Sequence, residues 1–131
     1  GVYEVQIFDS FEHPSCADGQ CGAIYGQWPP LVNASRPPGD WQSYDIIFYR
    51  PRWNSKGLVS PARVTVIHNG IVIQNNREIM GPTRHRTTTS YKNHGGMDFI
   101  KGPIKIQDHG NPLRFRNIWV RDLENGNDMG S

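Results

Sequence analysis

The chain has 131 residues, a formal net charge of +2 and 36% apolar residues. A chain of this length fits one domain around one core, and so small a charge excludes nucleic acid as the main partner, because that partner needs a concentrated basic face. The 14 glycines and 10 prolines are spread along the sequence, which argues against a bundle of long helices, and no apolar run approaches the ~20 residues needed to span a bilayer.

The first predicted element is a strand over residues 2–9. Tyr3, Val5 and Ile7 alternate with Glu4 and Gln6, a period of two that is typical of a strand with one face on a core. Glu4 and Gln6 then share the polar face, where a carboxylate can act as a general base or metal ligand and an amide can orient a hydroxyl. The alternative is the solvated polar face of an ordinary strand.

Two local motifs within residues 11–35 are typical of exported proteins. Cys16 and Cys21 enclose a short Gly-containing loop, so a disulfide could form across a turn, although two free thiols remain an alternative. Asn33-Ala34-Ser35 matches an N-glycosylation acceptor, a motif short enough to occur by chance. No signal-peptide pattern opens the sequence, so we expect an exported form to have lost its leader already.

The middle of the chain predicts further strands. A short strand is expected at 21–25, another at 41–49, and the Pro-rich stretch 51–61 is expected to be a loop. The strongest local signal is Asn69-Gly70, which joins two runs rich in β-branched residues. That dipeptide is the signature of a hairpin turn in which both residues need a positive φ.

The last third predicts a polar excursion over 81–102, a short strand at 103–107 and a final strand at 113–123. The apolar alternation of the final strand changes parity midway, so we expect a bulge near Asn117. Residues 125–131 are expected to be a flexible tail, which leaves 1–124 as the folded domain.

The turn between these last strands concentrates side chains that can do chemistry. Asp108, His109 and Asn111 follow one another closely, and an imidazole that titrates near neutral pH suits acid–base work or metal ligation. The alternative is that Asp108 and Asn111 only cap the turn through their own backbone.

Arg114 and Arg116 share one face of the strand that follows, and Asn117 comes directly after them. Two adjacent guanidinium groups need a carboxylate, such as Glu4 or Asp45, or an anionic or oxygen-rich ligand. The five histidines form no local metal-binding pair, so a divalent metal is neither indicated nor excluded by the sequence.

Short strands separated by frequent turn signals predict an all-β protein, an antiparallel β-sandwich or jelly roll. Successive blocks of the sequence resemble one family in particular, the 3-keto-disaccharide hydrolase domains. The blocks are 3–9 (YEVQIFD), 41–48 (WQSYDIIF), 61–70 (PARVTVIHNG) and 102–119 (GPIKIQDHGNPLRFRNIW). The resemblance runs from residue 2 to residue 123 and implies a concanavalin A-like, glucanase-like jelly roll of a kind common in exported bacterial proteins. We therefore expect a secreted or periplasmic protein.

The chain departs from that family in two respects. The family domain carries additional strands before the block at Tyr3, so this chain resembles about the last two thirds of it and is expected to leave open edges and an uncovered apolar face. Another chain, neighbouring copies of this chain, or a missing N-terminal segment would then supply the strands. The Cys16/Cys21 pair is the second departure.

The resemblance also implies a carbohydrate ligand and a reaction. The carbonyl of a 3-keto sugar acidifies the proton on C2, so a base can remove it, the glycosidic oxygen leaves, and water adds back. On this basis Glu4 and His109 are the base or acid candidates, Arg114 and Arg116 would stabilise negative charge, and hydroxyl groups would be held by Gln6, Asn111 and Asn117.

Two other readings stay open. The domain could bind sugar without turning it over, or it could be a structural subunit of an extracellular assembly that neighbouring chains complete by donating strands.

Overall fold

The computed structural model describes residues 3–14, 17–83, 90–94 and 102–123. The chain divides into two compact units, Gly1–Ile100 and Lys101–Ser131, and each is described by itself. Within the described residues the regular elements are strands and one 3-10 helix, and no helix has the length and apolar character that crossing a membrane requires. The predicted all-β class is confirmed. The predicted boundary between a domain at 1–124 and a tail at 125–131 lies outside the described residues.

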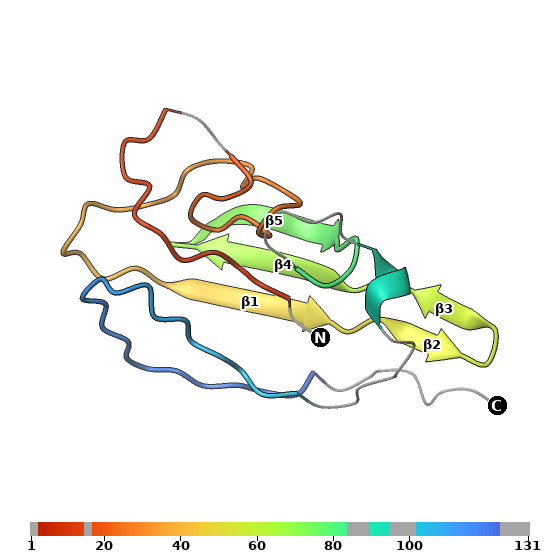
Figure 1. Cartoon of the computed structure of the whole chain (residues 1–131). Helices are drawn as coiled ribbons and strands as arrows, with labels where there is room; N and C mark the ends of the chain where they lie inside the picture. Colours follow the sequence, from red (N-terminus) through yellow and green to blue (C-terminus); the bar gives the residue numbers. More distant parts are fainter. Residues whose placement is uncertain (1–2, 15–16, 84–89, 95–101, 124–131) are drawn as a thin grey trace. The chain divides into compact units, whose positions relative to one another are not determined.

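The first unit is built on a three-stranded antiparallel sheet with the order β1-β4-β5 (Figure 1). Its strands are β1 (Tyr44–Tyr49), β4 (Arg63–His68) and β5 (Ile71–Glu78). Asn69 and Gly70 join β4 to β5 with φ angles of 52° and 82°. Both turn residues have a left-handed backbone conformation, which matches the right-handed twist of the strands that they join. The predicted hairpin is therefore confirmed.

The stretch predicted as a loop at 51–61 is a second hairpin, β2 (Arg52–Asn54) paired with β3 (Gly57–Ser60). It continues the β1–β4 pairing beyond Pro51 and Pro61, which stand opposite one another between the two ladders. Proline has no N–H to donate, so two facing prolines interrupt the pairing without ending the hairpin. The prediction failed because both prolines were taken as loop signals.

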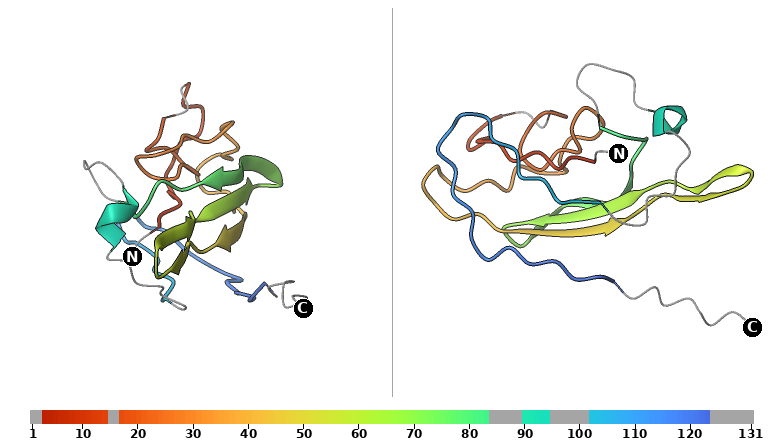
Figure 2. Two further views of the ribbon diagram at one scale, coloured as in Figure 1. Left: turned by 90° about the vertical axis from the view of Figure 1, so that its right-hand side faces the viewer. Right: turned by 60° about the horizontal axis from the view of Figure 1, so that its bottom comes forward.

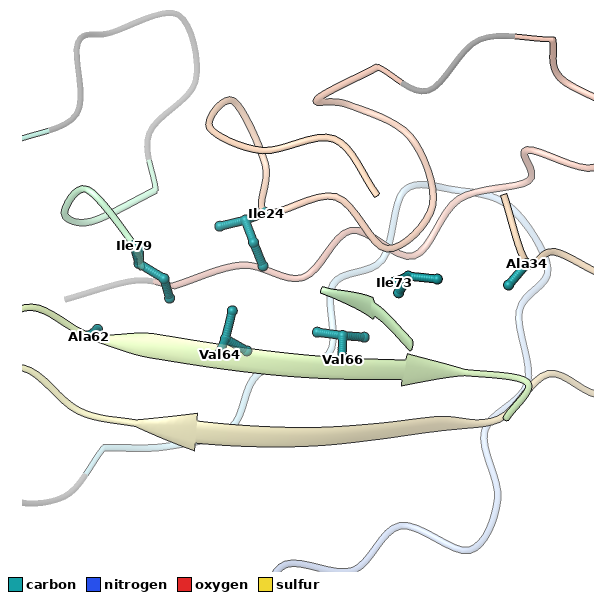
Figure 3. Close-up of a cluster of buried hydrophobic side chains, with 7 residues drawn as sticks. All are labelled: Ile24, Ala34, Ala62, Val64, Val66, Ile73 and Ile79. Atoms are coloured by element: carbon teal, nitrogen blue, oxygen red, sulfur yellow. The ribbon is translucent and has the colours of Figure 1, made fainter. Parts of the chain in front are cut away.

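The core lies on one face of the sheet, between the strands and the loops that precede them. Val64 and Val66 on β4 point toward Ile24 of the N-terminal loops, with Ile73 of β5 beside them (Figure 3). Figure 2 shows from two further directions that the N-terminal loops lie over this one face of the sheet. Burying four such side chains contributes on the order of 1.5–3 kcal/mol each to the free energy of unfolding.

Two buried glutamines fasten the loop at residues 20–30 to the strands. The Gln74 amide nitrogen on β5 donates to the carbonyls of Pro29 at 3.0 Å and Gly22 at 3.2 Å. The Gln27 amide donates to the Gly81 carbonyl at 3.0 Å, and its oxygen accepts from the Met80 N–H at 2.7 Å. These bonds satisfy loop carbonyls and amides that burial would otherwise leave unpaired.

The predicted strand at 2–9 is only partly formed. Val5 makes an isolated antiparallel bridge with Ile24, the one residue of the predicted 21–25 strand that pairs with it, and no longer ladder is present within the described residues. The inward side of the alternation is confirmed in part, since Tyr3 and Val5 pack against the core while Ile7 is exposed.

The described part of the second unit, residues 102–123, contains no assigned strand, so the predicted strands at 103–107 and 113–123 are not formed there. A strand needs a paired neighbour to satisfy its backbone, and the two predicted segments do not pair with one another in this unit. Asn117 has a φ of 54°, so the backbone does change conformation where the bulge was predicted.

The predicted Cys16–Cys21 disulfide is not supported. Cys21 is a free, buried cysteine, and Cys16 lies outside the described residues. The Cys21 sulfur lies 2.7 Å from the hydroxyl oxygen of Tyr44, and its backbone N–H donates to the Ser10 hydroxyl at 3.0 Å. The thiol is therefore part of the packed interior, where it faces a tyrosine on β1.

Cys21 should resist thiol reagents in the folded chain and react only after denaturation. Titration with an aromatic disulfide reagent, with and without denaturant, measures this. A denatured, unreduced protein that shows no reactive thiol, with an intact mass two hydrogen atoms lower, would restore the disulfide.

Gly22 should be intolerant of any side chain. Its φ is 80°, and a Cβ there would overlap the Cδ1 atom of the buried Ile73. We expect Gly22→Ala to lower the free energy of unfolding by roughly 2–5 kcal/mol, through backbone strain and overpacking together. Gly39→Ala is the matched control, because Gly39 has a φ of 94° with nothing within 4 Å, and strain alone should cost about 1 kcal/mol. Equal losses for the two variants in chemical denaturation would contradict the predicted clash.

Candidate functional site

The predicted site residues Glu4 and Gln6 lie on an extended segment that is held by its backbone. The Glu4 N–H donates to the Thr83 hydroxyl at 3.2 Å, and the Gln6 N–H donates to the Ala23 carbonyl at 2.9 Å. Because Val5 between them packs on the core, the Glu4 and Gln6 side chains belong to the opposite side of the segment, and both are half-buried. The core contacts of Tyr3 and Val5 are those that the predicted alternation requires, and the role of Glu4 and Gln6 stays a prediction.

The other predicted site residues lie in the second unit. His109, Asn111, Arg114, Arg116 and Asn117 are all exposed there. The Asp108 carboxylate accepts the Gly110 N–H at 2.7 Å, so it caps its own turn, as the structural alternative predicted. Glu4 and Gln6 belong to the first unit, so convergence of the two sets on one concave surface stays a prediction.

A polar cluster that the sequence interpretation missed lies around His68, the buried residue at the end of β4, while its members Gln42 and Arg36 are exposed. Its centre is the Gln42 side-chain oxygen, which accepts from the Asn69 side-chain amide at 2.6 Å, the Arg36 N–H at 3.0 Å and the His68 Nε2 at 3.1 Å. Asn69 also donates to the Ala34 carbonyl at 2.7 Å. The cluster joins the loop at residues 34–43 to the turn between β4 and β5. The signal in the sequence was an Asn in a type I′ turn directly after a His at the end of a predicted strand.

His68 is the titratable member of this cluster. Its side chain is fully buried on the core face of β4, and Nε2 must carry the proton, because the Gln42 oxygen can only accept. Its Nδ1 is buried and has no hydrogen-bond partner among the described residues. Burial lowers the pKa of His68 below its usual value, and the nearby charge of Arg36 lowers it further. His68 is therefore neutral at pH 7. Its hydrogen bond to Gln42 joins the end of β4 to the loop at residues 34–43.

Tyr44 links His68 to the buried thiol. The Tyr44 ring stacks on the His68 ring with centroids 4.4 Å apart, and its hydroxyl meets Cys21. Burial raises the pKa of Tyr44 far above its ordinary value, and the Cys21 thiol adds to the shift. The phenol stays protonated at any physiological pH, so Tyr44 supplies no phenolate base or nucleophile.

The described residues contain no group of three or more His, Cys, Asp or Glu side chains placed to hold a metal ion. The described residues therefore give no support to a divalent metal site, which the sequence had neither indicated nor excluded. Chemistry in the first unit would instead rest on Glu4, a half-buried carboxylate on the segment outside the core.

Residues 1–121 match the 3-keto-alpha-glucoside-1,2-lyase-like domain family. The chain belongs to this family. It is a carbohydrate-active family with a concanavalin A-like fold, as the resemblance of the sequence blocks implied.

A solved structure agrees with the family match. The chain is similar to the crystal structure of a candidate glycosyl hydrolase from Parabacteroides distasonis, with 43% sequence identity and a TM-score of 0.63. The similarity covers 69% of this chain but only 39% of that chain, so this chain spans about two fifths of its solved relative. No curated protein matches the chain.

His68 predicts how stability depends on pH. Its folded pKa is lowered, so the unfolded chain binds the proton more readily, and stability is lost as the pH falls below the unfolded His value of about 6.5. We expect a lower melting temperature at pH 5.5 than at pH 7.5, and a smaller difference in His68→Gln.

The control for this measurement is His109→Gln, which removes an exposed imidazole and should keep the pH dependence of the parent. If His68→Gln also kept the whole difference, other groups would be responsible for it.

Proposed function

We propose that this domain cleaves 3-keto-glucosides by elimination, with Glu4 and His109 as the acid–base pair. The 3-keto group acidifies the C2–H bond. A base takes the C2 proton, the electron pair forms a C1–C2 double bond, and the C1–O bond breaks. The departing oxygen takes a proton from an acid, and water can then add across the new double bond to complete a hydrolysis.

The observation that carries the proposal is the family match over residues 1–121, together with the placement of Glu4. A base needs a defined position, and the Glu4 backbone is bonded at both its N–H and its carbonyl, the latter accepting from the Tyr25 N–H at 3.3 Å. The half-buried carboxylate keeps access to a ligand. Gln6, on the same side of the segment, is suited to hold a sugar hydroxyl.

The second half of the proposed machinery is cationic and exposed. An enolate oxygen develops on the 3-keto group as the C2 proton leaves, and guanidinium groups stabilise such charge. Arg114 and Arg116 are the candidates for this role, with Asn111 and Asn117 as hydroxyl ligands. His109 is suited to protonate the leaving oxygen, since an imidazole can exchange protons near neutral pH.

One specific observation favours a second candidate function, sugar binding without turnover. The chain spans only 39% of its solved relative, so part of a catalytic centre can belong to polypeptide outside it. A sugar-binding surface could still be present within this chain.

Export to a secreted or periplasmic location remains our inference from the family resemblance alone. The free, buried Cys21 removes the disulfide as support for it.

Glu4→Gln should lower kcat/KM for a 3-keto-α-glucoside by roughly 100-fold or more, because the amide cannot take the C2 proton. Glu12→Gln is the matched control, since Glu12 is an exposed carboxylate outside the proposed site. The measurement follows release of a chromophoric aglycone, and deuterium at C2 should slow the parent enzyme.

His109→Ala should slow protonation of the leaving oxygen. The loss of turnover should therefore be smallest for aglycones that leave without a proton. Equal turnover of the unoxidised glucoside would contradict the elimination route. Calorimetric binding of the keto-glucoside without any product would instead support the sugar-binding module.

A further inference from the structure

The turn between β4 and β5 consists of a dipeptide that is chemically labile. Asparagine followed by glycine loses its side-chain amide more readily than asparagine before other residues, because glycine has no Cβ to shield its backbone nitrogen. The sequence contains this dipeptide at Asn69-Gly70, in the turn, and again at Asn125-Gly126, which lies outside the described residues. A reactive pair therefore stands at the point where the two central strands are joined.

The reaction of such a pair passes through a five-membered cyclic imide. The Gly70 backbone nitrogen loses its proton and its electron pair forms a bond to the Asn69 Cγ atom, while the bond from Cγ to Nδ2 breaks and ammonia leaves. Water then opens the ring at one of its two carbonyls. One opening gives an aspartate, and the other gives an isoaspartate, whose main chain runs through Cβ. The reaction consumes water and needs no other co-reactant.

The folded turn keeps the reacting atoms apart. Ring closure requires the Gly70 nitrogen to eclipse the Asn69 Cβ atom about the bond between Cα and the carbonyl carbon. Asn69 has a φ of 52°, and a left-handed residue has a ψ of about +47°, which turns the next nitrogen to the side opposite Cβ. Attack on Cγ therefore requires the turn to leave its type I′ conformation.

Hydrogen bonds hold the Asn69 side chain in the same unreactive arrangement. Its Nδ2 donates to the Ala34 carbonyl at 2.7 Å and to the Gln42 side-chain oxygen at 2.6 Å, and its Oδ1 accepts from the Ser43 N–H at 2.9 Å. The Asn69 N–H also donates to the Ser43 carbonyl at 2.9 Å. Rotating the side-chain amide into the ring would break all three side-chain bonds, so the backbone and the side chain oppose the reaction together.

We propose that Asn69-Gly70 is a deamidation site that the fold keeps closed, and that its reaction in chains whose β4–β5 turn has opened prevents the turn from closing properly again. An aspartate at this position would set a carboxylate against the Ala34 and Gln42 oxygens, which accepted bonds from the lost amide and cannot donate. An isoaspartate would add one main-chain atom to a two-residue turn. The proposal involves none of the residues of the proposed enzyme function.

The unaltered chain tests the closure of the site directly. It is incubated at mildly alkaline pH, folded in one sample and in denaturant in the other, and peptide mass spectrometry with an isoaspartate assay follows each asparagine. In denaturant Asn69 and Asn125 should react at similar rates, because both precede glycine. In the folded chain Asn69 should react about 100-fold or more slowly than in denaturant, since the reaction waits for the turn to open.

Three results of this experiment would overturn the proposal. Equal rates at Asn69 in the two samples would mean that the folded turn does not close the site. A faster reaction in the folded chain would mean that the turn promotes the attack. An Asn69 that stays intact in denaturant while Asn125 reacts would mean that the turn dipeptide is not a deamidation site.

A pair of variants tests the consequence of the reaction. Asn69→Asp is one of its products and should lower the melting temperature by on the order of 5–10 °C. Asn75→Asp adds the same charge at an exposed position of β5 and should change the melting temperature little. Equal shifts for the two variants would overturn the predicted consequence.

A second measurement applies if Asn69→Asp does not fold. Chains that have deamidated in denaturant are returned to buffer, and size-exclusion chromatography separates the refolded from the unfolded fraction. Chains modified at Asn69 should collect in the unfolded fraction. An equal share of them in both fractions would overturn the proposal.

Discussion

The first unit depends on the docking of one loop, residues 20–30, against the β4–β5 hairpin. Ile24 supplies the apolar contact with Val64 and Val66, and the Gln74 side chain bonds loop carbonyls from within the core. A loop carries many backbone polar groups, and burying them without partners would cost more than one isoleucine returns. The glutamines make the docking favourable, and they fix the distance at which the loop sits from the strands.

The placement of Glu4 follows from that docking. The Val5–Ile24 bridge attaches the N-terminal segment to the docked loop, and the Thr83 hydroxyl accepts the Glu4 N–H. Displacing the loop would therefore displace the carboxylate as well. Stability and the proposed chemistry are coupled through the same few hydrogen bonds, although Glu4 itself makes no contribution to the core.

What could be predicted from the sequence was local. The Asn69-Gly70 turn requires two left-handed residues in succession, and that demand is met by the dipeptide itself, whatever surrounds it. The packing of Tyr3 and Val5 against the core followed from strand parity in the same local way. The β2–β3 hairpin was missed because Pro51 and Pro61 signal a break, and the sequence does not show that strand pairing resumes between Arg52 and Ser60.

Burial of polar groups could not be predicted in the same way. Gln74, Gln27 and His68 read as surface residues by composition, and their roles depend on carbonyls and amides that are distant in sequence. The strands predicted at 103–107 and 113–123 failed for the opposite reason. Their alternation is correct for a strand, but pairing is a property of two segments, and 103–107 and 113–123 do not pair with one another in the described part of that unit.

The chemistry of a 3-keto sugar explains why a single well-placed carboxylate can be enough. An ordinary glycosidase needs two carboxyl groups at a set separation, because nothing in its substrate weakens the glycosidic bond in advance. A ketone beside C2 makes the C2 proton acidic, so the substrate itself is prepared for loss of the glycosidic oxygen. The protein then needs one base, charge stabilisation and a proton source. Under the proposed function, Glu4 would be that base, His109 the proton source, and Arg114 and Arg116 the groups that stabilise the charge. An elimination mechanism therefore asks less of this polypeptide than a two-carboxylate mechanism would.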